Sequence, residues 1–316
     1  MTLTVLAGGL QTTVQDLGRG GHRHLGIGVA GALDAHSLRI GNLLVGNDAG
    51  AAALEVTLQG PRLKFGRAVR IAITGADLEA QCDGVALPGW RPIVLPAGCE
   101  LVLGPCRRGA RAYLAIAGGV DVAPVLGSRG TDLRAGFGGL EGRALAAGDT
   151  LAIGPASIAA VDAPHVARWW VDPAPDLDFR RSPVLRVLPG RDAAALDAQA
   201  WRVSAQSNRQ GLRLEGTALA PAQGGERISE PVAPGTVQLP PDGQPIVLLG
   251  EAQTIGGYPR IGHVIAADMP RLAQLHPGDE VRFEAVGAAT AHGLACAQRA
   301  RLARIGLAIG RRAHGG

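Results

Sequence analysis

Glycine and proline limit the length of any regular element that this chain can form. The 316 residues include 47 glycines and 21 prolines, which are spread along the whole sequence. Because both residues mark turns, this spacing predicts many short strands separated by turns. Hydrophobic residues make up 47% of the chain and aromatic residues only 3%, so aliphatic side chains must form the cores. We therefore expect a mainly β protein with short helices (α+β), and the apolar content excludes disorder as its main state.

A weak repeat supports this prediction. Residues 95–103, 145–153 and 275–283 each place a glycine turn before an alternating or apolar strand. Such units are typical of β-barrels. We therefore expect a β-barrel-like module in both halves of the chain.

Composition divides the chain into two lobes and a tail. Residues 1–160 are predicted to form an N-terminal β-rich lobe, and residues 183–286 a C-terminal β-barrel lobe. Residues 161–182 combine prolines with Trp169, Trp170 and alternating charges, which is typical of an interdomain connection. Residues 287–316 form a basic tail with five arginines and no acid, predicted to be a solvated, loosely amphipathic helix over residues 288–309. A short helix is also predicted over residues 192–201.

Residues 238–263 hold the densest group of ligand-binding candidates. Gln238 opens the segment, and the apolar run 246–249 predicts a buried strand. Gln253, Thr254 and Tyr258 follow with donors and acceptors but no strong base. Gly256 and Gly257 could adopt a positive φ and expose backbone N–H groups. This chemistry suits an amide, a carboxylate or a ureido group, although a polar hairpin between two strands explains the same residues.

The N-terminal region offers a second group. Gln15, Asp16 and Arg19 lie close enough in a glycine-bounded stretch to share one site, although a local salt bridge is the simpler interpretation. Asp34 is predicted to cap a helix over residues 35–45, with Gly46 closing it.

Two further features adjoin this helix. Asn47 follows the helix end, and Glu55 lies among apolar neighbours in a predicted strand. If Glu55 points inward it needs a partner such as Arg19, because a buried charge is costly when it is unpaired. Residues 128–139 form a glycine-rich loop that is either mobile or able to close over a ligand.

A third polar group lies in the second half. Ser207, Asn208 and Arg209 are consecutive, and Arg213 follows on a predicted strand. Arg209 and Arg213 could each bind a carboxylate or phosphate through two parallel hydrogen bonds. Glu215 could instead pair with Arg213 on the strand.

Charge and lysine content exclude several functions. The net charge is +4, but without the five tail arginines the balance is 26 basic residues against 27 acidic ones. No basic face with interleaved aromatics is predicted in the body, so we expect no nucleic acid partner. Lys64 is the only lysine and Phe65 follows it, so the sequence contains neither a phosphate-binding P-loop nor a biotin-carrier lysine. The G-x-G-x-x-G pattern at residues 26–31 lacks the preceding strand that a dinucleotide site needs.

Cysteine and histidine spacing gives no strong metal signal. Cys82, Cys99, Cys106 and Cys296 form no Cys-x-x-Cys pair, so we expect reduced thiols that are mostly in the core, and no metal site. The segment His22-x-His24 could offer two ligands, but no third is evident. With no signal peptide pattern and no apolar run near about 18 residues, we expect a cytoplasmic protein without a membrane partner.

The motifs together resemble the KipA family, also called allophanate hydrolase subunit 2. The resemblance covers about residues 9–283 and rests on many motifs in the family's order. The motifs that carry it are Gln11-Thr-Thr-Val-Gln15-Asp16-Leu-Gly18-Arg19, Gly31-Ala-Leu33-Asp34, Asn42-Leu-Leu-Val-Gly46-Asn47, Leu54-Glu55-Val-Thr-Leu-Gln-Gly60-Pro61, Ser207-Asn208-Arg209-Gln-Gly211-Leu-Arg213, Ser229-Glu230-Pro231, Gly243-Gln244-Pro245-Ile246, Gln253-Thr254-Ile-Gly256-Gly257-Tyr258-Pro259 and Pro277-Gly278-Asp279. Leu33 and Gly41 are mild departures, because the family usually has Met and Ala there.

The resemblance implies a fold, partners and a reaction. It implies two cyclophilin-like β-barrel lobes, a KipI-like protein as the B subunit and, for oxoprolinase members, a LamB/YcsF-like protein as the A subunit. The family includes the C subunit of bacterial ATP-dependent 5-oxoprolinase, which opens the lactam of 5-oxoproline to glutamate, and the carboxyltransferase region of urea carboxylase. ATP would be held with or by one of the partners, because this sequence lacks a P-loop.

Three functions follow as hypotheses. The first is the C subunit of 5-oxoprolinase, acting on a small lactam. The second is carboxyl transfer from carboxybiotin, carried on another protein, to urea or an amide. The third is a non-catalytic regulator that binds a KipI-like protein. We favour the first and expect the polar groups of both lobes to line one cleft.

For that function we predict three catalytic residues and a set of substrate-binding residues. Asp16 or Tyr258 would handle a proton, and Arg209 would position the substrate. The predicted substrate-binding residues are Gln15, Arg19, Asp34, Asn47, Ser207, Asn208, Arg213, Gln238, Gln253, Thr254, Gly256 and Gly257.

Overall fold

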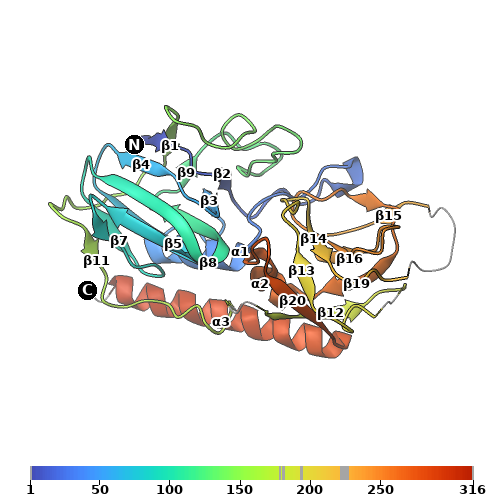
Figure 1. Ribbon diagram of the computed structural model, residues 1–316. Coiled ribbons are helices and arrows are strands. Elements are labelled where there is room, and N and C mark those ends of the chain that lie inside the picture. Colours follow the sequence, from blue (N-terminus) through green and yellow to red (C-terminus); the bar gives the residue numbers. More distant parts are fainter. Residues whose placement is uncertain (1, 178, 180–181, 193–194, 221–227, 315–316) are drawn as a thin grey trace.

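Two β-rich lobes lie side by side above one long helix (Figure 1). The computed structural model describes residues 2–177, 179, 182–192, 195–220 and 228–314. The N-terminal lobe holds β1 to β11, and the C-terminal lobe, which we call the barrel lobe, holds β12 to β20. The prediction of a mainly β fold is confirmed.

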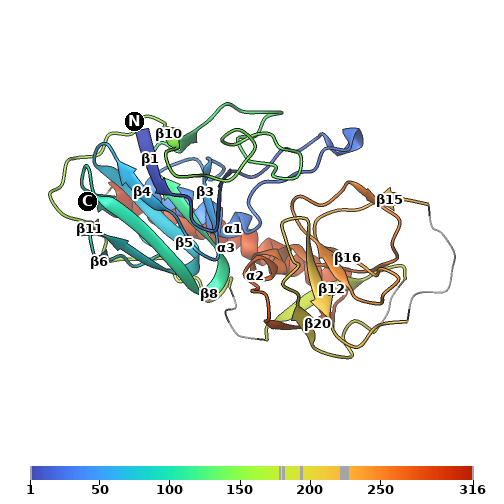
Figure 2. The ribbon, with the colours of Figure 1, turned by 45° about the horizontal axis from the view of Figure 1, so that its top comes forward.

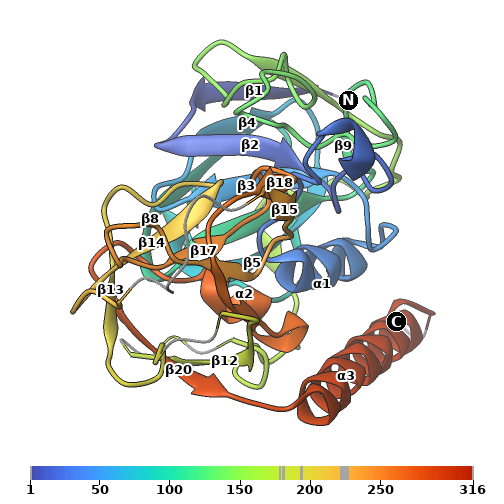
Figure 3. The ribbon, with the colours of Figure 1, turned by 90° about the vertical axis from the view of Figure 1, so that its right-hand side faces the viewer.

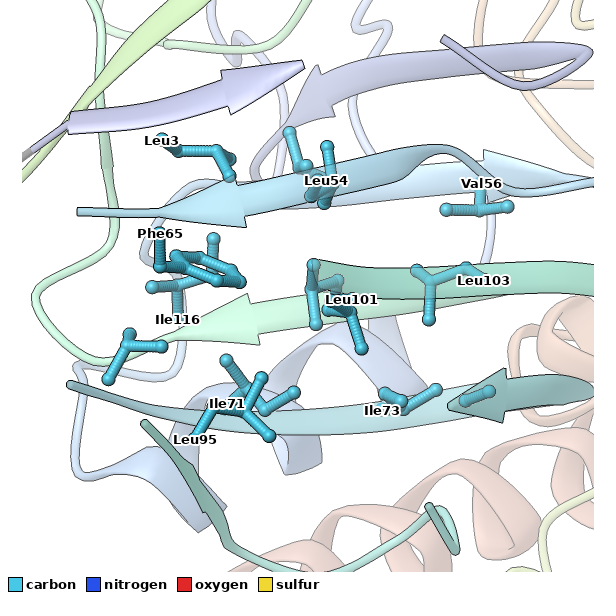
Figure 4. Close-up of a cluster of buried hydrophobic side chains, with 14 of the residues drawn as sticks. Leu3, Leu54, Val56, Phe65, Ile71, Ile73, Leu95, Leu101, Leu103 and Ile116 are labelled. Atoms are coloured by element: carbon cyan, nitrogen blue, oxygen red, sulfur yellow. The ribbon is translucent and has the colours of Figure 1, made fainter. Parts of the chain in front are cut away.

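The N-terminal lobe is built on one sheet of eleven strands. They are β1 (Thr2–Ala7), β2 (Gln11–Gln15), β3 (Ala53–Thr57), β4 (Arg62–Phe65), β5 (Val69–Cys82), β6 (Val85–Ala86), β7 (Ile93–Leu95), β8 (Glu100–Ile116), β9 (Val120–Asp121), β10 (Thr150–Ile153) and β11 (His165–Val166). The long antiparallel pair of β5 and β8 runs from Ile71 opposite Ile116 to Cys82 opposite Leu101, and register shifts near Gly75 and Leu78 bend it. Aliphatic side chains from these strands, including Leu54, form the core that sequence composition requires (Figure 4).

One helix and one loop connect this lobe to its neighbour. Helix α1 (Ala35–Val45) begins at Asp34, whose side chain accepts a hydrogen bond from Ser37 N, and ends at Gly46 with φ 85°. Both predicted ends are confirmed. Residues 20–29, which include the short helix η1 (Arg23–Leu25), extend over the barrel lobe (Figure 1), where Arg23 donates to Val232 O.

The barrel lobe contains a closed barrel of seven strands. They are β12 (Val184–Pro189), β13 (Trp201–Val203), β14 (Gly211–Glu215), β16 (Thr236–Gln238), β17 (Ile246–Leu248), β19 (Arg260–Val264) and β20 (Glu280–Ala285). A separate ribbon joins β15 (Glu230–Pro231) to β18 (Ile255–Gly256), and η2 (Ala266–Asp268) leads into α2 (Met269–Ala273). Trp201 is fully buried in this core.

The predicted helix over residues 192–201 is wrong. The described residues 195–200 form turns, and β13 begins at Trp201, while residues 193–194 lie outside the described part. Tertiary contacts explain the difference, because the Asp192 carboxylate accepts from Arg260 N and the Trp201 indole donates to Leu196 O. These bonds outweigh the helix propensity of the alanines.

The C-terminal helix α3 (Ala288–His314) extends beneath both lobes (Figures 1 and 3). It is helical as predicted, but it is not simply solvated. Leu302, Ile305 and Ile309 pack on the cluster that includes α1, and Arg301 pairs with Asp176 of the interdomain segment at 2.6 Å. Among the described residues, no helix has the length and apolar character needed to cross a bilayer.

Candidate functional site

A pocket of about 340 Å³ opens beside the β15–β18 ribbon of the barrel lobe. We call it the barrel-mouth pocket. The residues that line it are Arg191, Asp192, Ile228, Glu230, Gly256, Gly257, Tyr258 and Arg260. The pocket therefore contains the glycine and tyrosine part of the segment that the sequence marked as the densest group of candidates.

Gln238 does not line this pocket, but its amide lies against Gly256, which does. Gln238 ends β16, is 1% exposed, and its Oε1 accepts from Gln253 Nε2 at 3.3 Å. Its Nε2 has no partner among the described residues. A Cβ at Gly256 would lie 2.7 Å from that nitrogen, so only glycine leaves the amide room. Buried polar groups are normally bonded, so an unmatched buried donor next to a pocket indicates a ligand or an ordered water.

Gly256 serves the site differently from the prediction. Its φ is not in the positive region, so the expected left-handed backbone at this residue is wrong. It is instead part of the β15–β18 ribbon, opposite Glu230. What requires glycine here is the close approach of the Gln238 amide.

Charged side chains of both signs form the rim. The Glu230 carboxylate pairs with Arg260 and lies 3.7 Å from Arg191. Tyr258 is 48% exposed, so its phenol is accessible at the opening. The pocket thus combines a neutral donor against its Gly256 with two guanidiniums at the rim, an arrangement that suits a small ligand with a carbonyl and a carboxylate.

A larger hollow of about 830 Å³ lies elsewhere, between the β8 region and residues 274–280. Its arginines have partners, since Arg107 pairs with Glu79 at 2.6 Å and Arg108 with Asp77 at 3.2 Å, just as Arg260 and Arg191 of the barrel-mouth pocket pair with Glu230. A buried donor that is unmatched among the described residues, Arg111 Nε, also belongs to a residue bonded to the lining residue Gln274. We give the barrel-mouth pocket more weight because Gly256, Gly257 and Tyr258 of the segment marked by the sequence line it.

Arg209 lies at the contact between the lobes. It is 4% exposed, pairs with Glu55 of β3 and with Glu251, and donates to Gly31 O at 2.6 Å. Burial opposes its charge, but the Glu55 and Glu251 carboxylates outweigh burial and hold the pKa of Arg209 above its usual value. Glu55 does point inward, the case for which the sequence required a partner, but that partner is Arg209 of the other lobe and not the suggested Arg19. Each of the three guanidinium nitrogens of Arg209 thus donates to a partner within the protein.

Asp34 belongs to the same contact. Its carboxylate accepts from Ser37 Oγ at 2.6 Å and from Gln274 Nε2 of the barrel lobe at 2.9 Å, and Tyr113 Oη accepts from its backbone N–H. Burial raises the pKa of Asp34 despite these donors, and burial beside Glu55 raises the pKa of Tyr113 well above its usual value. We call Asp34, Glu55, Tyr113, Arg209, Glu251 and Gln274 the interlobe cluster.

Gln15, Asp16 and Arg19 come together as predicted, and they hold one loop. Gln15 Nε2 donates to Thr131 O at 3.0 Å, and the Asp16 carboxylate accepts from Ser128 Oγ at 2.6 Å. Arg19 donates to Gly130 O and stacks on a ring 4.6 Å away, that of Phe137. The glycine-rich loop of residues 128–139 is therefore tied to β2.

Some buried polar atoms of this loop contact have no hydrogen-bond partner in the described part of the protein. Gln15 Oε1 and the Nε and Nη1 atoms of Arg19 have no hydrogen-bond partner among the described residues, although Nη1 lies 4.0 Å from Asp132. Burial lowers the pKa of Arg19, while Asp132 and Asp16 act in the opposite direction. The structure thus places the predicted residues in two separate groups, here and at the barrel mouth, and the expected single cleft is not formed by the described pockets.

The remaining predicted residues stabilise turns. Asn47 Nδ2 donates to Asn42 Oδ1 and Ile116 O. Asn208 Oδ1 accepts from two backbone amides of its own turn, and Ser207 Oγ accepts from Arg213 N. Arg213 is exposed, and Thr254 is 7% exposed behind β15, where its carbonyl accepts from Val232 N.

Sequence reasoning missed the rim and much of the interlobe cluster. Arg191 and Asp192 follow a Pro-Gly turn with no marked motif, and Arg260 was passed over although it lies in the marked segment 238–263; only the fold brings the three to one pocket. Glu230 had a usable signal, because it stands in the quoted Ser-Glu-Pro motif. Gln274 had none, since its role depends on reaching Asp34 across the two lobes.

Comparison with known proteins adds independent findings. A family model described as carboxyltransferase domain, subdomain A and B, matches residues 25–285. The chain is 46% identical over 291 residues to the C subunit of 5-oxoprolinase from Escherichia coli, covering 89% of this chain and 90% of that protein. It is 31% identical over 303 residues to urea amidolyase of Saccharomyces cerevisiae, covering 87% of this chain but 16% of that protein.

A solved structure supports the fold over nearly the whole chain. The crystal structure of K. lactis urea amidolyase superposes with a TM-score of 0.88 at 28% identity. The match covers 96% of this chain and 20% of that one, so the present chain spans about a fifth of that larger protein. Of the two cyclophilin-like barrel lobes expected from the resemblance, the C-terminal lobe agrees with its closed seven-stranded barrel, whereas the described strands of the N-terminal lobe form one eleven-stranded sheet.

Proposed function

We propose, from the premise that this chain belongs to the carboxyltransferase-domain family of subdomains A and B, that it is the C subunit of a 5-oxoprolinase. The complex would open 5-oxoproline to L-glutamate with ATP hydrolysis. The name of the Escherichia coli relative supports an enzyme made of several different chains. We propose a KipI-like protein as its B subunit and a LamB/YcsF-like protein as its A subunit.

The observation that carries the proposal for this chain is the unmatched amide of Gln238. A lactam carbonyl accepting from Gln238 Nε2 would match the buried donor, and the carboxylate of 5-oxoproline would face Arg260 and Arg191 at the rim. Tyr258, exposed at the opening, is the group placed to exchange a proton with the substrate. The donor stabilises negative charge that develops on the carbonyl oxygen during ring opening.

The sequence has no P-loop, and its single lysine, Lys64, is exposed on β4. We propose that ATP is held with or by a partner protein, where the lactam is activated, and that this chain binds and orients the substrate.

A reconstitution assay tests the proposal. The purified chain with its two partners should release glutamate and phosphate from 5-oxoproline and ATP, and omission of this chain should abolish turnover. Gly256→Ala should lower kcat/KM by at least about 100-fold, because its Cβ meets the Gln238 amide and removes about 3 kcal/mol of transition-state binding. Gly262→Ala in β19 is the matched control, since its Cβ makes only ordinary contacts, of which the nearest is 3.5 Å.

Two outcomes would count against it. No glutamate release by the complete complex would remove the oxoprolinase assignment. Equal loss in Gly256→Ala and Gly262→Ala, with both folded, would remove the barrel-mouth pocket as the site while leaving the assignment open.

Carboxyl transfer is the second candidate, and the likeness to urea amidolyase favours it. Biotin would then arrive on another protein, because this chain has no carrier lysine. A biotinylated protein that copurifies with the chain, together with inhibition by avidin, would distinguish this function from ring opening.

A further inference from the structure

Two cysteines and an aspartate meet at the β5–β6 turn of the N-terminal lobe. Cys82 and Cys99 are 0% and 4% exposed, while Asp83 is exposed. One ligand atom from each residue lies within 4.8 Å of the other two. Figure 2 shows β6 on the side of the N-terminal lobe that faces away from the barrel lobe, so this cluster is separate from the barrel-mouth pocket.

The backbone fixes this arrangement. Asp83 N donates to Glu100 O at 3.1 Å, and Glu100 N donates to Asp83 Oδ1 at 3.0 Å. In the antiparallel register Cys82 lies opposite Leu101, and Cys99 stands two residues before Leu101, so the two thiols are diagonal neighbours on one face. The second carboxylate oxygen of Asp83 lies 3.9 Å from Cys82 Sγ, so the carboxylate covers the thiol pair from the solvent side.

Two sulfurs and one carboxylate oxygen are a zinc ligand set. Zinc binds four ligands in a tetrahedron, with bonds of about 2.3 Å to sulfur and about 2.1 Å to oxygen, which puts neighbouring ligand atoms about 3.5–3.8 Å apart. The ligand atoms, which lie within 4.8 Å of one another, need to approach by about 1.3 Å at most to reach that spacing. The exposed side of Asp83 leaves room for water as a fourth ligand. Soft thiolates select zinc over magnesium or calcium.

We propose that Cys82, Asp83 and Cys99 bind one zinc ion that joins the β5–β6 turn to the start of β8. On binding, each thiol loses its proton to solvent and its sulfur forms a bond to the metal, while Asp83 contributes a carboxylate oxygen. Two protons are therefore released for each zinc bound. Sequence spacing predicted no metal site, because 16 residues separate the two cysteines. Only the register of the β5–β8 pair brings them together.

Metal binding to the full chain tests the proposal. The protein is purified under a reducing agent, stripped with a chelator and titrated with zinc, with bound metal measured by atomic emission and protons by titration. Cadmium then serves as a probe, because its bonds to thiolates absorb in the near ultraviolet. We expect one zinc and two protons per chain.

Variants assign the site. Cys82→Ser and Cys99→Ser should weaken binding by more than about 100-fold, and Asp83→Asn, which keeps the acceptor for Glu100 N, by about 10-fold. Cys106→Ser and Cys296→Ser are the controls, and the second matters because Cys296 lies 3.4 Å from His292 Nε2 on α3. If a cysteine variant does not fold, cadmium absorption by the wild type and by Asp83→Asn still decides the question.

Three results would overturn the proposal. One is less than half an equivalent of tightly bound zinc on the wild type. Another is binding that survives Cys82→Ser but is lost in Cys296→Ser, which would move the metal to α3. The third is a Cys82–Cys99 disulfide in protein whose thiols were trapped by alkylation at lysis.

Discussion

Replacing Arg209 with methionine tests whether its guanidinium stabilises the contact between the lobes or acts on the substrate. The substitution removes the guanidinium but keeps the aliphatic volume, and it leaves the carboxylates of Glu55 and Glu251 buried at 1% and 4% exposure. Removing one partner of a buried ion pair costs about 3–5 kcal/mol, because the remaining charge stays desolvated. We therefore expect Arg209→Met to lower the free energy of unfolding by about 3–5 kcal/mol.

The assay is urea unfolding, followed by circular dichroism and by tryptophan fluorescence, to which Trp201 of the barrel lobe contributes together with Trp90, Trp169 and Trp170. Arg62→Met is the matched control. Its side chain is 54% exposed and pairs with Glu100, so its loss should cost about 0–1 kcal/mol. Adding Glu55→Gln and Glu251→Gln to Arg209→Met should recover part of the loss, since no unpaired charge then remains buried.

The reasoning would be refuted by one clear result. If Arg209→Met unfolds within about 1 kcal/mol of the wild type, the buried pairs do not hold the lobes together. If that stable variant also fails in the reconstituted assay, the guanidinium acts on the substrate, as the sequence suggested.

Three further predictions address other parts of the molecule. Asp34→Asn should cost about 1–3 kcal/mol in unfolding free energy, because Oδ1 of Asp34 accepts from Ser37 N while Oδ2 accepts from Ser37 Oγ and Gln274 Nε2, so the NH2 group of asparagine would face a donor at one of these positions; the exposed Asp242→Asn should cost less than about 0.5. Burial lowers the pKa of His263 below its usual 6.5, so the unfolded chain binds the proton more readily than the folded one. The unfolding free energy should therefore fall as pH drops below 6.5. His263→Gln should make this fall shallower, and a pH dependence equal to that of the wild type would contradict the prediction. Leu101→Ala, at 0% exposure, should cost about 2–5 kcal/mol by urea unfolding, and a loss below about 1 would mean that the core around it relaxes.

The sequence predicted local structure well because local chemistry determines it. Asp34 and Gly46 mark the ends of α1 through a side-chain cap and a left-handed glycine, and both signals lie within one turn of the helix. The glycine turns before β8 and β20 behave similarly. The helix predicted over residues 192–201 does not form, because other interactions hold this segment. The Asp192 carboxylate accepts from Arg260 N, which is distant in the sequence, and the indole of Trp201, which is buried in the barrel core, donates to Leu196 O.

Site prediction was limited for the same reason. Gln238 and Gly256 were selected from one segment, but their relation, an amide against a missing Cβ, exists only once β16 lies beside the β15–β18 ribbon. Arg209 was selected because a guanidinium can bind a carboxylate through two parallel hydrogen bonds. In the structure its nitrogens bind carboxylates of the protein itself, Glu55 and Glu251, and not a substrate. Residue type therefore indicated the kind of partner, a carboxylate, but not which carboxylate.

The division between these groups has a consequence for how the lobes cooperate. Each charged side chain of the interlobe cluster has a hydrogen-bond or ion-pair partner within the protein, and several of these bonds join the two lobes, so we expect the cluster to fix their relative orientation. The barrel-mouth pocket and the Arg19 loop contact keep unmatched atoms instead, Gln238 Nε2 in one and Gln15 Oε1 in the other. A buried polar atom without a hydrogen bond costs free energy, so we expect ligands or partner proteins to supply the missing bonds to Gln238 Nε2 and Gln15 Oε1. The rigid contact between the lobes would hold these two sites at a constant separation. A ligand that accepts from Gln238 Nε2 should then raise the unfolding free energy of both lobes, which should still unfold in a single transition, because the interlobe cluster couples the barrel lobe to the N-terminal lobe.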